Sequence, residues 1–426
     1  MKGEKAKAGA VMSGRLNLAN SFLYMTSYYM VAPTSAAYAS SLGLDPSLSG
    51  VIIGMTALAA LASTFLYSWW TSYSYKDALK FSSICCLLGN IVYALGLPFH
   101  SLKLVLIGRF LIGFGSARAI NRRFIADAYT NTDRTAASLA FVASSAAGMS
   151  FGPALSALVP YFVGEDNLFW GEENAPAWIV AALWFTFLAM HILYFVDPPK
   201  KNVILGDNVA NAMQPLIPQR DWKSDAPFWK RPVCLVTTYL IFLLKLILEL
   251  VSSSAAPICS HDFGWSTSAT GWYLAIANGL VLPAAFGATY LLRYLQDRQL
   301  ILLASAGMLL GGIVVVNYAS SITTYEYNPM RYIVGTCLLF IAPNIMEAPA
   351  MSLLSKNIPM GLRTGLFNLG FFTTEAGFGG RVVADLFLTI IGSWGIEDLV
   401  NRLYRTLVAV SLLSLALVYA MYDDLV

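Results

Sequence analysis

In "DPPKKNVILGDNVANAMQPLIPQRDWKSDAPFWKR" (residues 197–231), the chain has its longest polar interval, and long apolar runs lie on either side of it. The interval is rich in proline, asparagine and charge, a composition typical of a linker. Apolar windows predict six membrane-crossing segments before it and six after it. The sequence therefore predicts an N-terminal six-helix bundle over 1–197, a cytosolic linker over 198–229 and a C-terminal six-helix bundle over 230–426.

The composition indicates an integral membrane protein. The 426 residues are 57% hydrophobic and only 12% charged, whereas soluble domains are about 25% charged. Runs such as "WIVAALWFTFLAMHILYFV" (178–196) are long enough to cross a bilayer as helices, and the alternating strands of membrane barrels are not found. We expect an all-α membrane protein with spans near 16–40, 48–71, 78–98, 103–129, 134–163, 175–197, 230–256, 268–292, 299–320, 330–355, 363–392 and 402–422.

The distribution of charge predicts the orientation. Basic residues gather before the first span, between the second and third spans, and in the linker, whereas the segment "GEDNLFWGEEN" (164–174) is acidic. Short basic segments stay in the cytosol, so both termini and the linker are predicted to be cytosolic. Arg402 and Arg405 fall on the other side and depart from this pattern.

Several classes of function are not indicated. The net charge is only +3, without the basic blocks that suit nucleic acid. The five cysteines and three histidines lack the spacing of a metal site, and no nucleophile is placed beside a base. We therefore expect no cofactor, no metal, no nucleic acid partner and no enzymatic activity.

Charged residues within the predicted spans are the main indication of a site, because each costs at least about 2.5–3.5 kcal/mol near the bilayer centre. In "GSARAINRRFIAD" (115–127), Arg118 lies near mid-membrane and Arg122 lies one helical turn closer to the cytosol. Two guanidiniums on one face can grip a tetrahedral oxyanion. We expect Arg118 to bind an anion; for Arg122, binding and bracing of the bundle are both left open.

Two further arginines of this span suit bracing or gating. Arg123 and Asp127 are one turn apart near the predicted cytosolic exit and are expected to pair. Arg109, at the start of "RFLIG", points away from Arg118 and is expected to pack within the bundle.

The C-terminal half adds its own ionisable residues. "LLKLILELV" (243–251) sets Lys245 and Glu249 one turn apart, so the two are expected to pair until an anion binds Lys245. "APNIMEAPAM" (342–351) places Glu347 between two prolines. We expect Glu249 and Glu347 to reset the empty site or to carry protons.

The predicted eleventh span carries three more ionisable residues, in "FFTTEAGFGGRVVAD" (371–385). Arg381 and Asp385 share a face and are expected to pair, whereas Glu375 points elsewhere and joins the candidate proton carriers. In the first span, Tyr24 and Tyr28 offer hydroxyls to a polar ligand, although such tyrosines commonly serve only packing.

The plan of two six-span halves resembles that of the major facilitator superfamily, in which paired bundles rock around a central site. "GMSFGPALSA" (148–157) fits that family's glycine and proline pattern. Gly148 and Gly152 permit close helix contact, and Pro153 bends the helix.

Four stretches resemble the transport domain of the SPX-MFS proteins, the plant vacuolar phosphate transporters and their relatives: 20–43, 107–129, 148–159 and 375–385. The resemblance implies inorganic phosphate as substrate and a vacuole-type membrane. It matches Arg118, Arg122 and Arg123 to the family's arginine motif, and Glu375 and Arg381 to its eleventh-span motif. Only residues 1–15 precede the first span, so the amino-terminal SPX sensor domain is not expected here.

These observations predict a transporter that moves inorganic phosphate by alternating access, from cytosol to a vacuole-type lumen, as a monomer in the lipid bilayer. A transporter or exchanger of another anion, and a receptor that binds phosphate without moving it, are the alternatives. Uniport is expected rather than proton coupling, because the arginine face of 115–127 suffices for an anion and the buried acids have candidate cationic partners.

Overall fold

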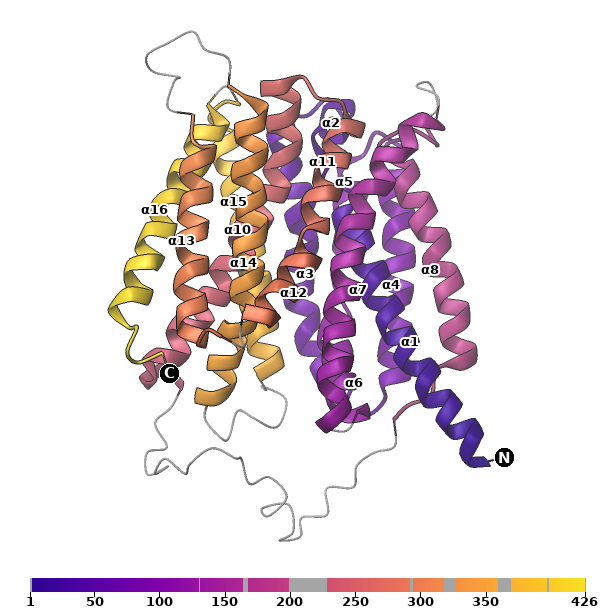
Figure 1. Cartoon of the computed structure of the whole chain (residues 1–426). Helices are drawn as coiled ribbons and strands as arrows, with labels where there is room; N and C mark the ends of the chain where they lie inside the picture. Colours follow the sequence, from indigo (N-terminus) through magenta and orange to yellow (C-terminus); the bar gives the residue numbers. More distant parts are fainter. Residues whose placement is uncertain are drawn as a thin grey trace.

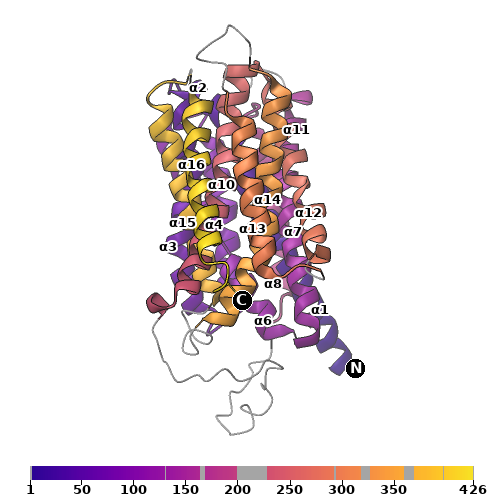
Figure 2. The same cartoon turned by 60° about the vertical axis from the view of Figure 1, so that its left-hand side comes forward.

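The structure is a computed structural model that describes residues 2–129, 131–163, 168–198, 228–291, 294–317, 327–358, 369–396 and 398–425. All regular secondary structure in these ranges is helical, as the composition predicts. Figure 1 shows the helices running roughly parallel in two groups, with both termini at one end of the molecule. The view in Figure 2, turned by 60°, keeps both termini at that end.

The first group is formed by the helices that precede the linker. They are α1 (Lys2–Tyr29), α2 (Ser35–Ser41), the short η1 (Pro46–Leu48), α3 (Ser49–Trp70), α4 (Tyr75–Leu95), α5 (Leu102–Phe114), α6 (Arg118–Ala128), α7 (Asn131–Leu158), η2 (Val159–Tyr161) and α8 (Ala175–Tyr194).

The second group follows the linker. Its helices are η3 (Phe228–Lys230), α10 (Pro232–Phe263), α11 (Thr267–Gly279), α12 (Val281–Leu291), α13 (Asp297–Val315), α14 (Pro329–Asn357), α15 (Leu369–Gly392) and α16 (Leu399–Ala420).

Nine spans in the described ranges are long and apolar enough to cross a membrane. The other three predicted spans also coincide with helices: 16–40 with α1 and α2, 268–292 with α11 and α12, and 363–392 with α15, whose first predicted residues lie outside the described ranges. Of these, α15 carries three ionisable residues, so it does not read as one uniformly apolar helix.

Local sequence explains where several helices begin and end. Ser74, Ser101 and Ser266 each accept a hydrogen bond from a backbone N–H in the first turn of α4, α5 and α11. Asn328 does the same for α14, ahead of a proline that suits the first helical position. Gly264 ends α10 with a positive φ of 63°, a conformation that favours glycine.

The predicted span 103–129 is not one helix, which corrects the sequence interpretation. It breaks at residues 115–117, between α5 and α6. The hydroxyl of Tyr67 donates to the carbonyl of Phe114 at 2.8 Å, and that of Ser82 donates to the carbonyl of Gly115 at 2.6 Å. These side chains satisfy carbonyls that a continuous helix would have used. The break places Arg118 in the first turn of α6.

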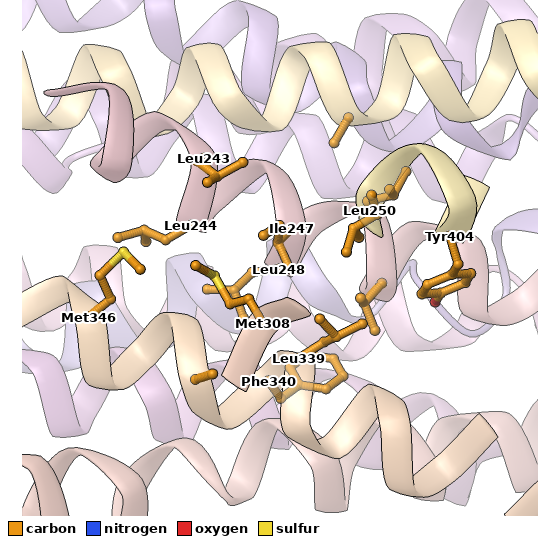
Figure 3. Packing of buried hydrophobic residues seen from close by; sticks show 14 of the residues in the cluster. Leu243, Leu244, Ile247, Leu248, Leu250, Met308, Leu339, Phe340, Met346 and Tyr404 are labelled. Carbon is orange, nitrogen blue, oxygen red and sulfur yellow. The ribbon is translucent and has the colours of Figure 1, made fainter. Parts of the chain in front are cut away.

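The apolar core forms two large clusters. One contains residues of 16–195 only, and the other, apart from Ala32, contains residues of 234–425. Figure 3 shows part of the second cluster, where Leu244, Leu248, Met308 and Met346 from α10, α13 and α14 face one another. Within the membrane, such packing stabilises the bundle through close van der Waals contact.

Small residues permit the closest helix contacts. A Cβ at Gly148 of α7 would lie 2.3 Å from the carbonyl oxygen of Phe22, and one at Gly152 would lie 2.8 Å from that of Thr26. Both glycines therefore pack against α1, as the "GMSFGPALSA" pattern predicts. Between the two groups of helices, Ser150 and Ser268 donate across the contact of α7 with α11 to the carbonyls of Ala275 and Ala157, each at 2.7 Å.

Candidate functional site

A pocket lies between the two groups of helices, and we call it the arginine pocket. Its empty space is about 360 Å³, part of which is open to solvent. One wall comes from α6 and the opposite walls from α10, α14 and α15. The lining residues are Arg118, Arg122, Ile241, Lys245, Glu347, Met351, Thr373, Thr374, Gly377, Phe378 and Arg381.

Arg118 and Arg122 are the two cationic residues that α6 contributes. They lie one turn apart and both line the pocket, as their spacing predicts. Arg118 donates to the sulfur of Met25 at 3.4 Å, and Arg122 donates to the hydroxyls of Thr373 and Thr374 at 3.3 and 3.2 Å. Neither guanidinium forms an ion pair with a carboxylate in the described part of the chain.

Lys245 pairs with Glu347, not with Glu249, so the predicted partner was wrong. The Nζ of Lys245 lies 2.7 Å from the Oε2 of Glu347, which comes from α14. Both residues line the arginine pocket. Glu249 lies one turn away from Lys245 along α10. The carboxylate of Glu347, on the neighbouring α14, points directly at the ammonium of Lys245 and forms the ion pair instead.

Glu249 instead pairs with Arg381, which also overturns the predicted pairing of Arg381 with Asp385. The Nη1 of Arg381 lies 2.7 Å from the Oε2 of Glu249, and the two side chains are 5% and 1% exposed. The same nitrogen donates to the hydroxyl of Tyr29 at 2.8 Å, and Tyr28 donates to Glu249 at 2.9 Å. The guanidinium also lies 4.9 Å from the ring centre of Tyr28. This buried ionic layer joins α1 to α10 and α15.

Asp385 lies one turn beyond Arg381 on α15 and belongs to the same layer. Its Oδ1 accepts a hydrogen bond from the hydroxyl of Ser253 at 2.5 Å, and the residue is 1% exposed. Its Oδ2 has no hydrogen-bond partner among the described residues.

Six residues predicted for the site lie outside the lining of the arginine pocket: Glu249, described above, and Tyr24, Tyr28, Glu375, Arg123 and Asp127. Tyr28 takes part in the ionic layer, and Tyr24 is buried beside Ser116 and Arg118. Glu375 lies near Thr64 of α3, and its Oε1 has no hydrogen-bond partner among the described residues.

The remaining arginines of the predicted fourth span brace the bundle. Arg123 donates to the carbonyl of Ser68 at 2.9 Å and lies 3.9 Å from Asp127, which in turn accepts from Tyr75. The predicted pair is present, at the end of α6. Arg109 is fully buried and donates to the carbonyls of Ile52, Ser27 and Tyr28, which agrees with the packing role expected for it.

Sequence reasoning missed the two hydroxyls of Thr373 and Thr374. A signal for Thr373 was available: it precedes Gly377 and Arg381 at four-residue intervals, so the three share one face of α15. Ile241 precedes Lys245 by the same interval on α10 and lines the pocket for the same reason.

The charges around the pocket do not balance. Four cationic side chains line it, and Glu347 and Glu249 neutralise Lys245 and Arg381. Arg118 and Arg122 remain as two positive charges without a carboxylate partner in the described ranges. Such a pocket suits a compact anion that carries close to two negative charges. No group of three potential metal ligands occurs in the described ranges.

Comparison with known proteins identifies the family. The family model of the Major Facilitator Superfamily matches residues 18–380. An SPX domain-containing membrane protein of Oryza sativa subsp. indica is 32% identical over 97% of this chain, and one of Arabidopsis thaliana is 31% identical over the same share. The chain spans 64% of the length of each relative.

Solved structures agree on the fold. A D-xylose-proton symporter superposes with a TM-score of 0.70 at 14% identity, covering 95% of this chain and 97% of the symporter. A bacterial homologue of the lysosomal transporter Spinster, inward-facing and unoccupied, gives 0.67 at 13% identity over 98% of this chain and 97% of its own. The resemblance to SPX-type membrane proteins is confirmed, and the chain belongs to the Major Facilitator Superfamily.

Proposed function

We propose that this transporter carries inorganic phosphate, by alternating access, from the cytosol to the lumen of a vacuole-type organelle. The observation that carries the proposal is the pair of guanidiniums in the arginine pocket, Arg118 and Arg122, which have no carboxylate partner in the described ranges. Two such charges match the dianion HPO₄²⁻, which coexists with the monoanion near neutral pH. The resemblance to SPX-MFS proteins supports the same substrate and the same type of membrane.

The polar groups of the pocket have distinct proposed roles. The guanidinium of Arg118 grips two phosphate oxygens, and Arg122 moves from the hydroxyls of Thr373 and Thr374 to the incoming anion. Lys245 contacts a further oxygen while it keeps its bond to Glu347.

Glu347 favours phosphate over sulfate in this arrangement. HPO₄²⁻ carries a P–OH group that can donate a hydrogen bond to a carboxylate, whereas the sulfate dianion has no hydrogen to donate. A buried carboxylate that faces sulfate would place acceptor oxygens against acceptor oxygens with no hydrogen bond between them, which costs binding free energy. Glu347 thus acts on selectivity and balances the charge of Lys245 in the empty site.

The decisive variant is Arg118→Ala, assayed by uptake of radiolabelled phosphate into liposomes that contain the purified protein. Loss of a charged hydrogen-bonding group costs about 1.5–3 kcal/mol, so affinity should fall by roughly 10- to 150-fold. Arg118→Lys should also be impaired, because an ammonium lacks the planar pair of donors.

Arg402→Ala is the matched control, because Arg402 lies on α16 beside Asp398, away from the pocket, and its loss should leave uptake unchanged. Unlabelled sulfate and citrate should compete poorly with phosphate. Normal uptake by the folded Arg118→Ala protein would refute the site, and binding of phosphate without any flux would identify a receptor instead.

A further inference from the structure

A second pocket lies at the end of the molecule away from the termini, beside α2, and we call it the distal pocket. Its empty volume is about 730 Å³, and its walls come from α2 and its flanking residues, from α10, and from α11 with the loop before it. It therefore also lies between the two groups of helices. The two pockets have no lining residue in common.

The buried ionic layer separates the two pockets. Along α10, Lys245 lines the arginine pocket, Glu249 and Ser253 belong to the layer, and Pro257 lines the distal pocket. These residues follow at four-residue intervals, so each lies about 40° around the helix from the one before, and together they span about 18 Å along its axis. An anion that passes from one pocket to the other must cross the layer.

The layer also joins the two groups of helices. Its links are the hydrogen bonds from Arg381 of α15 to Tyr29 of α1 and from Tyr28 of α1 to Glu249 of α10. Arg381 holds both Tyr29 and Glu249 through one nitrogen. If Arg381 turned away from them, both remaining partners would lose their cation and the layer would loosen.

Asp385 is the group that can draw Arg381 away. It lies one turn from Arg381 on the same helix, a spacing at which the two side chains can meet. In the structure they form no ion pair, and the Oδ2 of Asp385 faces the backbone of Gly54 on α3 without a hydrogen-bond partner. A buried, ionised carboxylate without an ion pair is strongly unfavourable, whereas a buried neutral carboxylic acid is tolerated.

The other charged and titratable neighbours of Asp385 are consistent with a preference for its neutral form. Glu249 on α10 repels a charge on Asp385, and Arg381 and the buried Arg109 of α5 attract it. Tyr28 of α1 interacts electrostatically with Asp385. Glu249 already occupies Arg381, and Arg109 is occupied by three backbone carbonyls.

We propose that Asp385 binds a proton during the transport cycle, and that release of this proton moves Arg381 from Glu249 to Asp385 and opens the ionic layer. The proton moves between water in the distal pocket and Oδ2, and the carboxylate left behind takes the guanidinium of Arg381. The sequence favours uniport, because Lys245 and Arg381 are candidate cationic partners of the buried acids. Asp385 lacks its cation in the structure, so this proposal favours proton coupling instead.

This inference rests on the transport function and not on the identity of the anion. The first test is therefore infrared spectroscopy of the purified full chain without phosphate, titrated from mildly acidic to mildly alkaline pH. The wild type should show a carboxylic acid carbonyl band that Asp385→Asn lacks. Glu375 also has an oxygen without a hydrogen-bond partner among the described residues, so the assignment depends on this difference spectrum.

Two variants make the infrared test decisive. Asp297→Asn is the matched control, because Asp297 pairs with Lys356 at 2.8 Å and should contribute no such band. Ser253→Ala removes the hydrogen bond to Oδ1 and should shift the Asp385 band, which provides a second assignment if Asp385→Asn folds poorly. Spectra of wild type and Asp385→Asn that agree throughout the titration would overturn the proposal.

The second test measures coupling in liposomes. Asp385→Asn cannot release a proton, so Arg381 should stay on Glu249 and the layer should stay closed. That variant should therefore lose both uptake of labelled phosphate and exchange of labelled for unlabelled phosphate, whereas Asp297→Asn should keep both. Uptake or exchange by folded Asp385→Asn at the wild-type rate would overturn the coupling role. If the wild type moves no phosphate at all, the proposed substrate fails, while the infrared result still decides the proton site.

Discussion

At the scale of single residues, the ion pairs Lys245 with Glu347 and Glu249 with Arg381 join different helices and not nearest neighbours in sequence. Lys245 and Glu249 are one turn apart on α10, yet they bind Glu347 of α14 and Arg381 of α15. Ion pairs within one helix contribute only about 0.2–0.5 kcal/mol in isolated helices. Tertiary packing can therefore override the local pairing at little cost.

The Glu249 and Arg381 pair permits a stability test at this scale. Glu249→Gln removes the only carboxylate bonded to Arg381 in the described ranges and leaves a buried cation, which should cost about 3–5 kcal/mol. The double variant Glu249→Gln with Arg381→Gln should recover much of the loss. The measurement is thermal unfolding of the purified protein. A double variant no more stable than Glu249→Gln would show that the charges do not stabilise each other.

At the scale of elements, glycines decide how closely helices approach. Gly148 of α7 faces the backbone of α1, and a Cβ there would lie 2.3 Å from the carbonyl oxygen of Phe22. In lipid, helix association depends on such close packing, because no apolar surface is removed from water. Elsewhere, the break between α5 and α6 is set by hydroxyls from other helices that take over backbone carbonyls.

Gly148→Ala should therefore separate α7 from α1. Overpacking of this kind costs about 1–3 kcal/mol, so the melting temperature should fall. The matched control is Gly287→Ala in α12, where a Cβ would meet nothing within 4 Å. Alanine is the better helix former, so that variant should melt at the same temperature or slightly higher. Equal melting temperatures for the two variants would contradict this account of Gly148.

At the scale of the whole molecule, the transporter has a pocket on each side of one buried ionic layer. The arginine pocket and the distal pocket both lie between the two groups of helices, where a rocking motion would open and close them. Four of the residues that link the groups, Tyr28, Tyr29, Glu249 and Arg381, form this layer. The layer is thus placed where a closed gate is needed.

The orientation of the molecule in its membrane can be tested at this scale. Both termini lie at one end of the molecule, and the basic residues predict that this end is cytosolic. Epitope tags at either terminus should be digested by protease added to intact organelles, while a tag inserted within 164–174 should be protected. The opposite pattern would invert the proposed direction of transport, from cytosol to lumen.

Sequence by itself determined the class of protein and the arginine face of α6. Apolar length and helical periodicity are local properties, so Arg118 and Arg122 could be placed on one face before any contact was known. Only the tertiary structure decided the partners of Lys245, Glu249, Arg381 and Asp385, and the break before α6. The reason is physical: a buried charge or carbonyl takes the best-oriented partner within reach, and in a bundle most candidates come from helices distant in sequence. Asp385 shows the consequence, since its pattern predicts a salt bridge that the folded chain gives to Glu249.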